Sequence, residues 1–96
     1  MGIEYSVTSD NFDKERFDAL LGKALAGSMD YIKVLSPETI EIKFDEKQSI
    51  PDAIINVEEN GMLFTYNGGY HHSWAIFGIL VAYMSEHFSS VNVQEL

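Results

Sequence analysis

The chain has 96 residues, of which 46% are hydrophobic and 22% charged, so its length and composition predict one globular domain over residues 1–96. Fifteen acidic residues against six basic ones give a formal net charge of -9, which disfavours nucleic acid, anionic membranes and phosphate-bearing substrates as partners. The sequence has no cysteine, which excludes disulfides and thiolate metal sites. A cationic protein is the expected partner.

The sequence has the pattern of neither a secretory signal nor a membrane span. Residues 1–6 lack a basic region followed by an apolar one. The longest apolar run, Trp74 to Met84, is shorter than the ~18 residues that a spanning helix needs. We therefore expect a cytoplasmic protein with no membrane partner.

The first two elements are predicted as a strand and an amphipathic helix. Apolar and polar residues alternate over residues 3–8, as in a strand with one buried face. The helix is predicted over Asp13 to Ala26, where apolar residues recur at the spacing of one helical face. Asp13 is its expected N-cap, Phe12 and Phe17 are placed to form a hydrophobic staple, and Gly27 is its expected left-handed stop.

A first hairpin is predicted after this helix. Its two strands are expected over residues 31–35 and 39–44, where β-branched and aromatic residues are frequent. Pro37 lies between the two segments, and its fixed backbone dihedral favours a turn there.

A second hairpin is predicted around Asn60-Gly61, because this pair is typical of a type I′ turn. With these two residues as the loop, Val57 is expected opposite Phe64. This register places one set of large apolar residues on the same face of the sheet. The set consists of Ile55, Val57, Met62, Phe64 and Tyr66.

The last two elements are predicted as a buried helix over Trp74 to Phe88 and a short strand around Val91 and Val93. The element order is then βαββββαβ, which predicts an α+β fold with a mainly antiparallel sheet and both helices on one face. Without either hairpin, this order resembles the ferredoxin-like arrangement, as an analogy of topology only.

The distribution of charge along the chain is uneven. All six basic residues lie at or before Lys47, and the charged residues that follow are all acidic. One interpretation is a solvated acidic surface that keeps the protein soluble. The other is a docking face, in which Glu58 and Glu59 at the second hairpin steer a basic partner toward the protein.

The segment 66–74 joins the second hairpin to the second helix and is dense in aromatic and imidazole groups. Tyr and Trp supply large, rigid contact areas, which favours recognition of a partner. The alternative is that Tyr70 and Trp74 fold inward onto the core while Ser73 caps the second helix. The predicted partner-binding residues are Glu58, Glu59, Tyr66, Tyr70, His71, His72 and Trp74.

The sequence contains no recognisable catalytic or metal-binding motif. His71 and His72 are adjacent, which is poor geometry for holding one metal ion, and the chain has no HxH or HExxH spacing. We therefore predict no catalytic residue, metal or cofactor. An enzyme or small-ligand site near His71 and His72 stays open as an alternative, because such groups assemble in space.

The second helix carries more apolar surface than one sheet face needs, which leaves a homodimer through this helix as a further alternative. In size and charge the chain resembles the acidic immunity proteins with which bacteria neutralise partner toxins. That resemblance implies an inhibitor of a basic protein and involves no sequence motif. The resulting prediction is a non-enzymatic, acidic protein-binding module.

Overall fold

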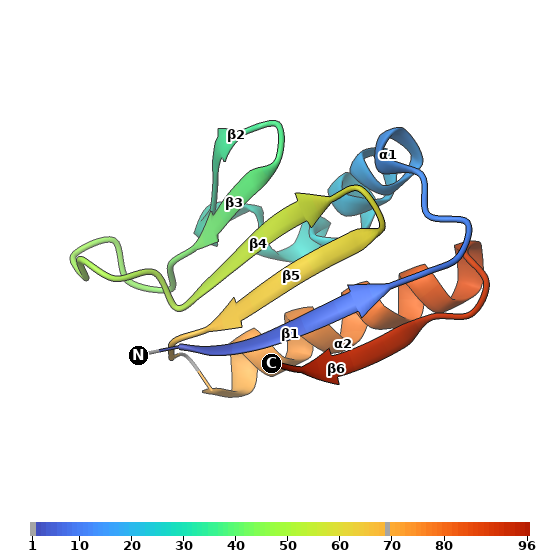
Figure 1. The fold of residues 1–96 in the computed structure, drawn as a ribbon. Helices are drawn as coiled ribbons and strands as arrows, with labels where there is room; N and C mark the ends of the chain where they lie inside the picture. Colours follow the sequence, from blue (N-terminus) through green and yellow to red (C-terminus); the bar gives the residue numbers. More distant parts are fainter. Residues whose placement is uncertain (1, 69) are drawn as a thin grey trace.

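The strands of this protein form one six-stranded antiparallel sheet, and two helices cover one of its faces (Figure 1). The computed structural model describes residues 2–68 and 70–96, with the side chains of residues 29 and 70 left out. The elements are β1 (Ile3–Thr8), α1 (Lys14–Ala24), the 3-10 helix η1 (Ala26–Tyr31), β2 (Ile32–Ser36), β3 (Thr39–Ile42), β4 (Ala53–Glu58), β5 (Gly61–Tyr66), α2 (Tyr70–His87) and β6 (Asn92–Glu95).

The predicted fold class and element order are confirmed. The strands lie in the order β2-β3-β4-β5-β1-β6, so four consecutive strands form a meander and β1 inserts between β5 and β6. β2 and β6 are therefore the two edge strands. Figure 1 shows β2 and β3 at one side of the sheet and β1 and β6, the first and last strands of the chain, at the other.

The start of α1 follows the prediction, and its end does not. The Asp13 side chain accepts a hydrogen bond from the Arg16 backbone N–H at 3.2 Å, as an N-cap does. The Phe12 and Phe17 rings lie 5.2 Å apart, in agreement with the predicted staple. The prediction of a stop at Gly27 was wrong: buried Leu25 caps the helix, and the chain tightens into η1 on its way to β2.

The predicted register of the β4–β5 hairpin was also wrong, by two residues. Val57 lies opposite Met62, and the loop consists of Glu59 and Asn60. Gly61 is the first residue of β5 instead of a turn residue, and it faces β1 at close range. A shift of two residues preserves the faces of both strands, so the predicted set of core-facing residues stays the same.

Gly61 is required by the neighbouring strand rather than by the turn. A Cβ atom at this position would lie 1.8 Å from the Val7 carbonyl oxygen, far inside van der Waals contact. The backbone of β1 therefore approaches β5 at a point where only glycine fits.

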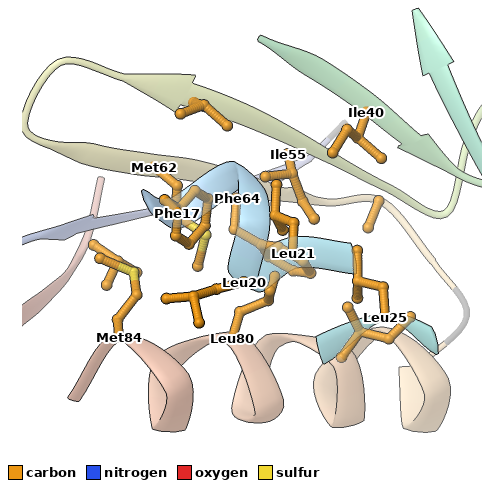
Figure 2. Packing of buried hydrophobic residues seen from close by; sticks show 14 of the residues in the cluster. Phe17, Leu20, Leu21, Leu25, Ile40, Ile55, Met62, Phe64, Leu80 and Met84 are labelled. Atoms are coloured by element: carbon orange, nitrogen blue, oxygen red, sulfur yellow. The ribbon is translucent and has the colours of Figure 1, made fainter. Parts of the chain in front are cut away.

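The core lies between the sheet and the two helices, and residues from the sheet and from both helices meet there (Figure 2). α1 contributes its apolar stripe and α2 contributes the face that points toward the sheet. The fully buried large side chains include Phe17, Ile42, Ile55, Phe64, Met62, Leu80 and Met84.

Buried Asp52 holds two connections together at one end of the sheet. Its carboxylate oxygen Oδ2 accepts a hydrogen bond from the Phe44 backbone N–H at 2.8 Å. Its backbone carbonyl accepts hydrogen bonds from the N–H groups of Asn67 and Gly68, at 2.8 and 3.0 Å. The β3–β4 connection and the segment before α2 are thus held by the same residue.

Two glycine-to-alanine substitutions test whether the backbone of β1 excludes a side chain at position 61. We expect Gly61→Ala to lower the free energy of unfolding by about 3 kcal/mol, because the new methyl group meets the β1 backbone. Gly22→Ala in α1 is the matched control, since a Cβ there meets nothing within 4 Å. It should raise the free energy of unfolding by about 0.5–1 kcal/mol through helix propensity.

Urea denaturation followed by the fluorescence of Trp74, the single tryptophan, measures both changes. Equal effects of the two substitutions would show that Gly61 is not constrained by β1.

Candidate functional site

The predicted partner-binding residues lie in two groups at opposite ends of the sheet. Glu58 and Glu59 are exposed at the β4–β5 turn, whereas Tyr66 ends β5 and pairs with Ala53 at the start of β4. Strands of six residues separate these ends by about 20 Å. The predicted residues therefore form no single continuous surface, and a role of either group in binding stays a prediction.

Trp74 packs into an aromatic cluster instead of standing free at the surface. Its ring stacks on Tyr66 at 4.8 Å and meets the edges of Tyr5 and Phe77 at 5.3 and 5.7 Å. Such pairs stabilise a fold beyond the area that they bury. Tyr5 also donates a hydrogen bond to the Glu95 carboxylate at 3.0 Å, and this bond raises the pKa of the Tyr5 phenol.

α2 begins four residues earlier than predicted, so the imidazoles belong to its first turns. His71 and His72 are exposed there, and the His72 ring lies 5.0 Å from Phe44. The prediction that Ser73 caps the helix was wrong: Ser73 is inside α2, fully buried, and donates a hydrogen bond to the Gly68 carbonyl at 2.7 Å. The side chain of Tyr70, the remaining predicted residue, lies outside the described part of the structure.

A hollow among the described residues lies elsewhere, between α1 and the β2–β3 hairpin. It has a volume of about 330 Å³, within the range of ligand and side-chain binding sites. We call it the α1–β2 cleft. Its lining residues are Asp18, Leu21, Gly22, Leu25, Ile32, Val34, Pro37 and Ile40.

The cleft opens beside an edge strand. β2 pairs with β3 on one side only, and of its core-facing residues Ile32 is half-buried against the core whereas Val34 is exposed. Val34 is 65% exposed although it lies on the same sheet face as buried Ile40, its partner in β3. Gly22 contributes to the opening, since it presents no side chain to the space between helix and strand.

The free edge of β2 is itself apolar. Tyr31 immediately precedes the strand, Leu35 is 49% exposed at a register irregularity opposite β3, and Lys33 is the single charged residue of β2. Native edge strands are usually protected by charge, proline or very short length. β6, the other edge strand, is shorter and carries Glu95, so β2 is the less protected of the two edges.

The electrostatics of the cleft favour a cation. Asp18 is the only charged residue in its lining, and the last carbonyl groups of α1 lie near its Leu25 end. A helix C-terminus carries a partial negative charge, which adds to that of the carboxylate. A second hollow, of about 280 Å³, lies at the start of β2 and has both acidic and basic residues in its lining.

The imidazoles of His71 and His72 line neither of these two hollows. Residues 2–68 and 70–96 contain no group of three or more histidine or acidic side chains placed to hold a metal ion.

Sequence reasoning missed the α1–β2 cleft. The apolar residues at 31, 34 and 35 are visible in the sequence. A strand at the edge of a sheet, however, has the same residue pattern as a strand in its middle. The order of strands was needed to show that this strand has one unpaired side.

Comparison with known proteins gives no relative from which a function can be transferred. No protein-family model, curated protein or solved structure matches the chain. None of the helices in the described ranges is long and apolar enough to cross a membrane. The functional argument therefore rests on the geometry of the site.

Alanine substitutions at Val34 and Ile40 test whether the surface of the cleft is available for binding or is required for folding. We expect Val34→Ala to change the free energy of unfolding by less than about 0.5 kcal/mol, because the side chain is mostly in solvent. Ile40→Ala, its cross-strand neighbour, should cost about 2–5 kcal/mol through loss of buried volume. Urea denaturation measures both, and a large loss for Val34→Ala would show that the cleft is part of the core.

Proposed function

We propose that this chain is a non-enzymatic protein-binding module that adds an extended segment of a cationic partner to the free edge of β2. An apolar side chain of that segment fills the α1–β2 cleft. The observation that carries the proposal is the mostly exposed Val34 on the edge strand β2, beside this apolar cleft.

Strand addition suits the backbone of β2. An edge strand presents a row of unpaired N–H and C=O groups, which supply affinity to any extended peptide, while side-chain pockets supply specificity. In a segment paired with β2, every second side chain points to the sheet face that carries Ile32 and Val34. These side chains enter the cleft, and the alternate ones lie over the opposite, helix-free face of the sheet.

The charge of the protein selects the partner. A net charge of -9 attracts a basic protein and raises its association rate at low salt. Asp18 then pairs with a Lys or Arg close to the apolar anchor. Such a role agrees with the size and charge that the chain shares with immunity proteins, which bind and block a basic partner.

Selection from a phage-displayed random peptide library tests the proposal without a known partner. We expect enriched peptides to alternate apolar and polar residues and to contain Lys or Arg. Gly22→Leu fills the cleft from an open helical position, so it should weaken binding of a selected peptide by about tenfold or more. Asp18→Asn should remove the preference for basic residues.

Glu58→Gln with Glu59→Gln is the matched control, because this pair lies at the far end of β4 and β5. Peptide affinity at physiological salt should stay within about twofold, since charges beyond a Debye length are screened. Selected peptides that bind the Gly22→Leu variant as tightly as the unmodified protein would contradict the proposal.

A further inference from the structure

α2 has an outer face that points away from the sheet and is exposed in the described structure. Its core-facing residues are buried against the sheet, whereas the residues on the far side are exposed. The fold thus leaves one side of an unusually apolar helix in water. We define the α2 outer face by His71, Ala75, Gly78, Ile79, Ala82 and Glu86, which are all exposed.

The α2 outer face is uncharged between its two ends. Ile79 is 40% exposed near its centre, and a Cβ atom at Gly78 would meet nothing within 4 Å. Of the fifteen acidic residues in the chain, this face carries Glu86 alone, at its end. Two copies of an acidic chain repel each other least where their uncharged faces meet.

The α2 outer face is also complementary to itself. Ala75 and Ala82 lie at equal distances from the midpoint of the face, between Gly78 and Ile79, and so do His71 and Glu86. In an antiparallel pair of α2 helices related by a two-fold axis, Ala75 of each copy meets Ala82 of the other. His71 of each copy comes within side-chain reach of Glu86 of the other, at both ends of the contact.

We infer that the α2 outer face binds a second copy of this chain in a two-fold symmetric, antiparallel helix pair. At its centre Gly78 of each copy faces Ile79 of the other, so the Ile79 side chain occupies the space that the glycine leaves open. The alanines on either side let the two helix backbones approach closely. The imidazole and carboxylate at the two ends supply complementary polar contacts and fix the antiparallel direction.

This interface is independent of the proposed peptide-binding edge. α2 packs below β5 and β1 through Trp74 and Phe77, whereas the edge of β2 lies at the other side of the sheet. Both β2 edges of the pair remain accessible. A dimer built this way presents two binding edges, so it can hold a partner that has two copies of the recognised segment more tightly than a monomer can.

Charge exchange across the two-fold axis tests the inference. Analytical ultracentrifugation of the unmodified chain should show a dimer at concentrations up to about 1 mM, the weak end of protein affinities. Ala82→Glu and Ala75→Lys should each give a monomer, because each buries an unpaired charge. An equimolar mixture of the two variants, or the double variant, should form dimers again, because the introduced ammonium of one copy then faces the introduced carboxylate of the other.

Both substitutions are at exposed helical positions, so urea denaturation should show that each single variant stays folded. A monomeric unmodified chain throughout this range would overturn the inference. Dimerisation that survives both single substitutions would overturn it too, because it would place the interface elsewhere on the molecule.

Discussion

Two helices are too narrow to cover six strands, and the exposed features of this protein follow from that limit. Neighbouring strands lie about 4.8 Å apart, so the six strands span about 24 Å between their outer axes. Two packed helices, each about 10 Å wide, cover about 20 Å. α2 lies over β5 and β1, and α1 faces the β2–β3 hairpin across the cleft, so Val34 at one edge of the sheet and all four residues of β6 at the other are exposed.

The two edge strands of the sheet, β2 and β6, differ in the side chains that they expose. β6 is short, exposed and polar at three of its four positions, so it offers little to a partner. β2 combines Val34 and Leu35 with an apolar cleft and one acidic residue, Asp18. The β2 side of the molecule thus combines exposed apolar side chains, an edge strand and an acidic residue, which are the features that the proposed peptide binding uses.

Local features of the fold were predictable from the sequence, and long-range ones were not. The cap at Asp13, the staple at Phe12 and the core-facing side of the second hairpin depend on residues close in the chain, and the structure contains all three. The hairpin register failed because Gly61 was interpreted by its turn preference, whereas its neighbour across the sheet, Val7, requires it. The cleft depends on which strand lies at the edge, and no residue pattern within β2 encodes that position.

Amide hydrogen exchange resolved by residue tests whether the β2 edge is open, because it reports which backbone N–H groups of the free protein are paired and covered. The β2 amides pointing away from β3 should exchange far faster than the amides of β4 and β5, which are paired on both sides. Protection of the β2 edge equal to that of the central strands would mean that another part of the molecule, or a second copy, already covers it.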